Sequence, residues 1–221
     1  MKCLVSPEAR ALGLHHSRAW RLTAATPLLG GDGLTAEQVA AAYDADSPLP
    51  EGYRKLLAEL GYPDVVPAGE RLRTVLGTRG WRAHGPVVDA VSVATLRHGA
   101  GIGLHRLLPA DAERDLVVAR ATGAERIVPA FSTRSRPIPA GDLIYGAREP
   151  EGNVEPFAWL GHRDCDSAER QLSEADHEGL LVVLGCPDEG TDHTEVIGAT
   201  VAEILRPVRA DITLTPLSHT E

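Results

Sequence analysis

The chain has 221 residues, of which 43% are hydrophobic and 24% charged, and its formal net charge is −9. This composition is typical of a globular protein that buries a sizeable core, and no apolar run approaches the roughly 18 residues that a membrane span needs. Because proteins that grip a long stretch of nucleic acid usually carry a basic surface, the acidic balance disfavours broad nucleic-acid binding, and DNA is not an expected partner.

The cysteines and the N-terminus bear on the cellular compartment. Cys3, Cys165 and Cys186 are odd in number and far apart, which argues against a disulfide framework. The opening residues, MKCLVSPEAR, contain no apolar core of the kind found in a signal peptide. We therefore expect the protein in a reducing cytoplasm.

The first hundred residues favour helices. Two short strands are expected at 2–6 and 18–25, and helices at 7–12, 36–45, 53–60, 67–76 and 86–98. Thr35 is a good N-cap, Pro86 suits a first helical turn, and Gly77 and Gly99 are placed to end helices.

After Gly99, β-rich runs dominate. Strands are expected at 115–121, 125–128, 142–146, 157–160, 179–184 and 211–214, with one more helix at 194–205. The pair around Thr122-Gly123 has a hairpin signature, and the apolar run GLLVVL is typical of a strand inside a sheet. This order predicts an α+β fold, with mixed β-sheets flanked by helices. One domain is expected over 1–221, with about 1–34 as an N-terminal extension packing on it.

The expected helix at 86–98 is apolar around most of its circumference, apart from a slanting polar stripe of Asp89, Ser92 and Thr95. Buried polar groups cost about 1–3 kcal/mol each unless they are paired. Each of these side chains could instead be satisfied within its own helix. An acid such as Asp89 stabilises a helix start, and the hydroxyl groups of Ser92 and Thr95 can bond to carbonyls one turn earlier. The three together favour a polar partner elsewhere in the chain.

Two other motifs point away from cofactor chemistry. The glycines of GAGIG, from Gly99 to Gly103, follow a helix instead of opening one, so they indicate close backbone approach and not dinucleotide binding. The residues His162, Cys165, Cys186 and His193 do not form the two compact pairs of a zinc site, and no metal or cofactor is expected. The acidic neighbours of Cys165 disfavour a reactive thiolate.

Two polar stretches remain as candidate binding segments. A long loop from Trp159 to Asp176 precedes the apolar strand, and long loops between core strands are often functional. The stretch ERLRTVLGTRGWRAHG concentrates the basic residues, either as a solvated helix face or as a contact for nucleic acid.

Several segments, in order, resemble the B3/B4 domain, the tRNA-editing domain of the phenylalanyl-tRNA synthetase β subunit, which also occurs as free-standing proteins. The resemblance is carried by YRKLLAELG, PAGERLRTVL, VVDAVSVATLRHGAGIG, IPAGDLIYG and SEADHEGLLVVLG. Ser92 stands where the family usually has Asn, Gly103 where synthetases can have His, and Arg106 where they have an acid. The chain lacks a synthetase catalytic core, so aminoacylation itself is not expected.

The resemblance implies a hydrolase that cleaves the ester between a wrong amino acid and the tRNA 3′ end by means of a positioned water, with no cofactor. Its candidate catalytic residues are Asp89, His105 and His162. Its candidate substrate-binding residues are Ser92, Thr95, Gly101, Gly103, Trp159, Arg163, Asp164, Ser173 and Glu174.

Two alternatives stay open. One is a module of the same fold that binds tRNA or an amino acid without turnover, and the other is an unrelated small-molecule enzyme that uses the same cleft. All three interpretations require the valine-rich helix and the loop after Trp159 to meet around a small polar cavity. The sequence indicates neither the amino acid nor the oligomeric state.

Overall fold

The computed structural model describes residues 1–161 and 164–219. The α-helices are α1 (Pro7–Arg10), α2 (Ala36–Ala42), α3 (Gly52–Glu59), α4 (Ala68–Arg79), α5 (Pro86–His98) and α6 (His193–Leu205). Short 3-10 helices are η1 (Pro109–Glu113) and η2 (Ala168–Arg170). The strands are β1 (Lys2–Val5), β2 (Arg18–Thr23), β3 (Ile102–Arg106), β4 (Leu116–Arg120), β5 (Arg126–Ile127), β6 (Arg136–Pro137), β7 (Leu143–Arg148), β8 (Val154–Leu160), β9 (Asp164–Asp166), β10 (Glu178–Val183), β11 (Thr213–Pro216) and β12 (Ser218–His219).

The described strands form two large sheets and one small one. The six-stranded sheet has the order β12-β1-β4-β7-β8-β9, and the four-stranded sheet has the order β11-β2-β10-β3. Only β1 pairs in parallel, with β12 and β4, and the other described pairs are antiparallel. The predicted α+β class, with mixed sheets flanked by helices, is confirmed.

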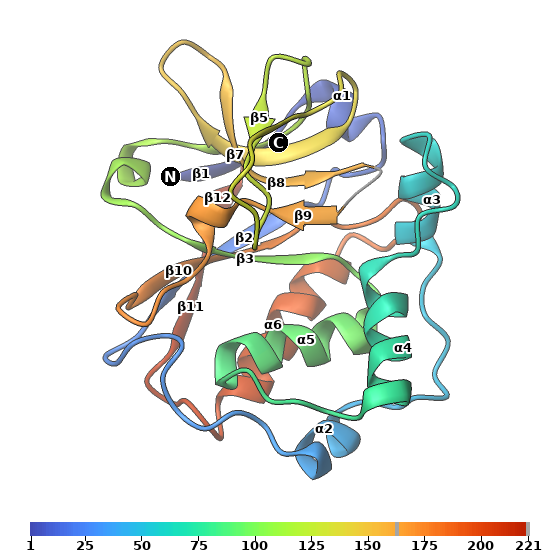
Figure 1. Ribbon diagram of the computed structural model, residues 1–221, viewed down its shortest axis with the longest axis vertical. Helices are drawn as coiled ribbons and strands as arrows, with labels where there is room; N and C mark the ends of the chain where they lie inside the picture. The colour runs from blue at the N-terminus through green and yellow to red at the C-terminus, as the bar shows by residue number, and fades with distance from the viewer. Residues whose placement is uncertain (162–163, 220–221) are drawn as a thin grey trace.

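The molecule is layered, with the four-stranded sheet between the six-stranded sheet and the helices α5 and α6 (Figure 1). Strand β10 shows why the central layer needs two apolar faces. Leu180 and Val182 pack in the core between the sheets, whereas Leu181 and Val183 pack in the core shared with α5 and α6. Successive side chains of a strand point to opposite faces, so a continuous apolar run is required, as predicted.

Helix ends follow the local signals in most places. Thr35 caps α2 in a capping box completed by Gln38, and Gly99 ends α5 in the left-handed conformation with φ 69°. The predicted stop at Gly77 is wrong, because α4 continues to Arg79 and ends at Gly80, whose φ is 72°. An isolated helical glycine weakens a helix but does not end it unless the backbone turns left-handed there.

The strand pairing differs from the sequence expectations at a hairpin and adds a strand. The strands β4 and β5, on either side of Thr122-Gly123, do not form a hairpin with each other, because β4 pairs with β7 and β5 with β6. Residues 1–34 supply β1 and β2, which lie inside the two large sheets. Strand β3, which was not predicted, begins at Ile102, inside the GAGIG stretch. No described helix is long and apolar enough to cross a membrane.

Candidate functional site

A small cavity lies where α5 and the glycine loop meet the six-stranded sheet. Its volume is about 220 Å³. The polar and backbone groups that matter at its lining come from Tyr53, Arg71, Thr95, Gly101, Gly103, Tyr145, Trp159, Cys165 and Asp166. We call it the inner cavity. It brings the valine-rich helix and the segment after Trp159 together, as the sequence analysis required.

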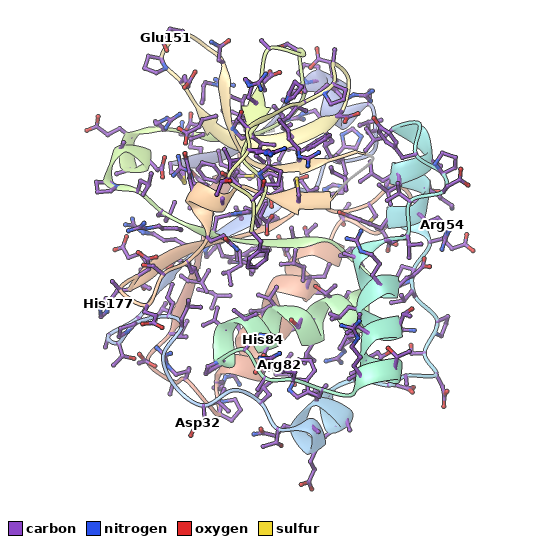
Figure 2. The ribbon with its side chains drawn as sticks, viewed as in Figure 1. Asp32, Arg54, Arg82, His84, Glu151 and His177 are labelled. Carbon is purple, nitrogen blue, oxygen red and sulfur yellow. The ribbon has the colours of Figure 1, made fainter. Side chains whose placement is uncertain are left out.

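A second and larger cavity, the outer cavity, adjoins the first. Its volume is about 460 Å³, and it shares Ile102 and Asp166 with the inner cavity. Ser92 lines the outer cavity and Thr95 lines the inner one. Residues three apart on a helix are neighbours on one face, so one side of α5 borders both spaces. His84, on the segment that leads into α5, also lines the outer cavity (Figure 2).

Two glycines make room for tyrosine hydroxyl groups at the inner cavity. A Cβ at Gly101 would collide with the hydroxyl of Tyr53, and a Cβ at Gly103 would collide with the hydroxyl of Tyr145. Tyr145 is placed by an irregularity in β7, where the register with β8 shifts between Tyr145 and Gly146. Such bulges re-aim a side chain. The glycine loop therefore provides close approach, as predicted, but to two side chains.

His105 lies behind Gly103 on β3 and is fully buried. Its Nε2 atom lies 2.7 Å from the hydroxyl oxygen of Tyr145 and 4.0 Å from a carboxylate oxygen of Asp166. Its Nδ1 atom has no hydrogen-bond partner among the described residues. Burial, with a smaller contribution from Arg170, lowers the pKa of His105 to about 3, so the ring is neutral near pH 7.

An ion-pair cluster supports this corner of the fold. Arg170 is 1% exposed, donates a 2.6 Å hydrogen bond to Asp111 and pairs with Glu155. Its guanidinium lies 4.1 Å from the ring centroid of Phe157. Partial burial acts to raise the pKa of Glu155, but hydrogen bonds from Arg114 and Arg170 hold that pKa below its usual range. The cluster joins η1, β8 and η2.

Trp159 is both a core residue and part of the cavity wall. It is 2% exposed, and its indole nitrogen donates a 2.7 Å hydrogen bond to Asp142. The other oxygen of Asp142 accepts a 2.7 Å hydrogen bond from Tyr62, and this bond raises the pKa of Tyr62 to about 12. The indole is thus fixed in orientation where it borders the inner cavity.

Asp89, a candidate catalytic residue, lies apart from both cavities. Its two carboxylate oxygens accept hydrogen bonds from the backbone nitrogens of Leu34 and His84, each at 2.8 Å. It is fully buried, and both contacts lie at the entry to α5. The three residues of the polar stripe therefore have different roles. Asp89 binds the backbone of two loops, whereas Ser92 and Thr95 line the cavities.

The loop after Trp159 also divides. Ser173 donates hydrogen bonds to the carboxylate of Asp176, which also accepts one from Arg106. Neither Ser173 nor the neighbouring Glu174 is among the lining residues of the two cavities. Asp164 belongs to β9 through its backbone. His162 and Arg163 lie outside the described residues. Gln171 and Leu172, from the middle of the loop, line the outer cavity.

The basic stretch contributes one residue to the inner cavity. Arg71 lines it, whereas Arg73 is turned toward the carbonyl oxygens of Ser47 and Leu96 and stacks on Tyr43. Sequence reasoning did not single out Tyr53 or Tyr145 as site residues, since a lone tyrosine in a helix or strand has no distinctive pattern. The sequence did contain a related signal, the glycines Gly101 and Gly103, which lie against the hydroxyl groups of these two tyrosines.

The comparisons with known proteins give a weak likeness. No family model matches the chain, and no curated protein matches it. Among solved structures, it is similar to an N-terminal fragment of the phenylalanyl-tRNA synthetase β subunit from Pyrococcus horikoshii, with a TM-score of 0.47 and 9% identity. The match covers 96% of this chain and 50% of that chain, so this chain spans about half the length of the fragment.

Proposed function

We propose that the protein is a free-standing aminoacyl-tRNA editing hydrolase, which cleaves a mischarged aminoacyl ester by means of a positioned water. One observation carries the proposal: Thr95, the glycine loop, Trp159 and Asp166 enclose an inner cavity at which Tyr145 is hydrogen-bonded to a buried histidine. The ordered segments that resemble tRNA-editing domains support the same class of reaction. The expected partner is the 3′ end of a tRNA with its attached amino acid.

The size of the two cavities suits an aminoacyl nucleoside. The inner cavity, at about 220 Å³, has the volume of roughly seven waters, which suits an amino-acid side chain but not a nucleoside. The outer cavity, at about 460 Å³, has room for a sugar and a base. Because the two share Asp166 and Ile102, the ester bond of such a ligand lies at their junction.

Tyr145 is the group that stabilises the developing charge. Buried N–H groups without a partner are rare in folded proteins, so the favoured tautomer of His105 carries its proton on Nε2 and donates it to the Tyr145 oxygen. The phenolic O–H then donates to the ester carbonyl oxygen as that oxygen becomes negative during attack. Fixed donors of this kind lower the barrier because they need no reorganisation.

Asp166 is the base in this scheme, because neutral His105 has too low a pKa to take a proton at neutral pH. The Asp166 carboxylate accepts a proton from water as the water oxygen bonds to the carbonyl carbon. The bond between that carbon and the ribose oxygen breaks, and the proton passes to the ribose oxygen. The products are a free amino acid and a tRNA with an intact 3′ hydroxyl. The ester is already activated, so no covalent nucleophile is needed.

The experiment is a deacylation assay against a panel of correctly charged and mischarged tRNAs. Tyr145→Phe is expected to lower kcat/KM by about 100-fold or more, as loss of one oxyanion donor does, and Asp166→Asn by a similar factor. Tyr43→Phe is the matched control, since Tyr43 is 9% exposed and packs away from both cavities. Its rate is expected to equal that of the native chain.

The two alternatives are distinguished by combining this assay with a measurement of RNA binding. A binding module without turnover retains the RNA and releases no amino acid from any tRNA in the panel. A small-molecule enzyme neither binds the RNA nor releases amino acid, and a thermal-shift screen of metabolites then identifies its ligands. Equal rates for the native chain, Tyr145→Phe and Asp166→Asn contradict the assignment of the inner cavity as the site of hydrolysis.

A further inference from the structure

Phe131 combines an exposed aromatic side chain with an unusual backbone conformation. Its side chain is 97% exposed and its backbone φ is 61°, in the left-handed region that bulky residues rarely occupy. An exposed phenylalanine gains nothing from burial, and the backbone conformation costs free energy. Residues kept in strained conformations cluster at ligand sites. The fold therefore leaves this ring in solvent at a cost in free energy.

The segment that leads into Phe131 is firmly attached to β9 and to the start of η2. The backbone nitrogen of Ala130 donates a 2.7 Å hydrogen bond to the carbonyl of Asp166, and Pro129 bridges to Ser167. The nitrogen of Ala168 donates to the carbonyl of Val128 at 2.8 Å. In Figure 1 this segment descends from β5 and passes in front of β9 toward β3. The backbone just before Phe131 is thus held in place, and the aromatic ring projects from it into solvent. We call this ring and its backbone the platform.

The platform borders the outer cavity. Ala130 and Phe131 line that space together with Ser92 of α5 and Gln171. Asp166, which the proposed hydrolysis uses as its base, lines both cavities. A flat group lying on Phe131 is therefore next to the point where the ester bond is placed.

The same segment is basic in an acidic protein. From Arg126 to Pro137 the sequence RIVPAFSTRSRP has three arginines and no acidic residue, against a net charge of −9 for the chain. Arg126 is tied to Ser135 by a 3.1 Å hydrogen bond, while Arg134 and Arg136 are exposed. An exposed aromatic ring beside cationic side chains is the combination that binds single-stranded nucleic acid, through base stacking and phosphate pairing.

We infer that residues 129–136 form a binding element for the single-stranded 3′ end of an RNA, in which the terminal base stacks on Phe131 and Arg134 and Arg136 pair with phosphates. This inference rests on the proposed function and supplies its RNA contact. The charge of the segment complements a polyanion, and the outer cavity limits the stacked group to about the size of one nucleoside.

The test measures binding of an RNA hairpin that carries no amino acid. The hairpin has a single-stranded 3′ end with 2-aminopurine at its last position. The native chain quenches the fluorescence, because stacking does so. Phe131→Gly weakens binding about 10-fold or more and abolishes the quench, whereas Phe131→Trp retains both. Because glycine accepts a φ of 61°, Phe131→Gly also unfolds at a higher temperature than the native chain, so lost binding is not lost folding. Val196→Ala, at a half-exposed site on α6, is the matched control and binds as the native chain does.

The salt dependence of RNA binding tests the role of the two arginines. Each phosphate contact with a single strand contributes about 0.7 to the slope of log affinity against log salt. Replacing Arg134 and Arg136 with Gln therefore lowers that slope by about 1.4. Phe131→Gly that binds the RNA as tightly as the native chain, or a native chain that does not bind it, overturns the inference. Weakened binding by Phe131→Gly in a protein that hydrolyses no ester overturns the proposed function and leaves this inference standing.

Discussion

The Nε2 atom of His105 lies 2.7 Å from the hydroxyl oxygen of Tyr145, and this contact joins the two large sheets. His105 belongs to β3 in the four-stranded sheet and Tyr145 to β7 in the six-stranded sheet. The contact is possible because Gly103, two residues before His105 on the same face of β3, has no Cβ to fill the space. A buried polar pair between two apolar faces specifies how those faces pack, since any other packing leaves both groups unpaired.

His105 makes the stability of the protein dependent on pH. The ring is neutral when folded, with a pKa of about 3, whereas an unfolded histidine titrates near 6.5. The unfolded chain therefore binds more protons between these values, so this contribution is complete above pH 6.5 and is lost as the pH falls. The loss is about 1.4 kcal/mol per pH unit. Between pH 6.5 and 4.5, the free energy of unfolding is expected to fall by about 2–3 kcal/mol more in the native chain than in His105→Gln.

Urea unfolding at several pH values measures this difference. Burial also lowers the pKa of His98, to about 4, but His98 is present in both proteins and cancels in the comparison. Parallel pH profiles for the native chain and His105→Gln contradict a neutral buried histidine.

Gly103→Ala is expected to close the inner cavity. The added Cβ meets the hydroxyl of Tyr145 and the Nε2 of His105, so the His105–Tyr145 contact must break or the sheets must separate. Overpacking of this kind costs about 1–3 kcal/mol, and deacylation is expected to be lost. Gly77→Ala, in the interior of α4 with open space around its Cβ, is the matched control and raises stability by about 0.5–1 kcal/mol. Full activity in Gly103→Ala contradicts the assigned site.

Asp89→Asn is expected to destabilise the fold without changing the chemistry at the cavities. The asparagine amide would face a backbone N–H where the second carboxylate oxygen now accepts a hydrogen bond from Leu34 or His84. Losing a charged acceptor and leaving a buried donor unpaired costs about 3 kcal/mol. Chemical denaturation measures the loss, and kcat/KM of the folded fraction is expected to be unchanged. Ser92→Ala, on the same helix, should leave stability within about 1 kcal/mol.

Arg170→Met is expected to be among the most damaging single substitutions outside the cavities. Asp111 is 1% exposed, and removing Arg170 takes away its closest cation. Its carboxylate then keeps the 2.7 Å hydrogen bond from the backbone nitrogen of Leu108 and the longer 3.4 Å contact from Arg114. Breaking a buried pair from one side costs about 3–5 kcal/mol. Arg21→Met is the comparison, because Arg21 and Glu178 are both about half-exposed, and such pairs contribute about 1 kcal/mol or less. Similar losses in the two variants, measured by urea unfolding, contradict a buried ion-pair cluster.

Much of the local structure was predictable because its causes are local. The capping signal at Thr35, the left-handed glycine after α5 and the apolar run of β10 act within a few residues, and each led to an element that the structure contains. The error at Gly77 arose because glycine is permitted at a helix end but does not require one. What ends α4 is the left-handed backbone at Gly80.

The sequence alone determined the α+β class and the apolar strand, since apolar periodicity and turn chemistry act at short range. Only the tertiary structure decided strand partners, as for β4 and β5, and which polar residues reach the cavities. Asp89 and Thr95 lie on one helix, yet one fastens two loops and the other lines the inner cavity. A hydrogen-bond partner 55 residues away in the chain, or a tyrosine from another sheet, leaves no periodic trace in the sequence because the two groups meet only when the layers pack.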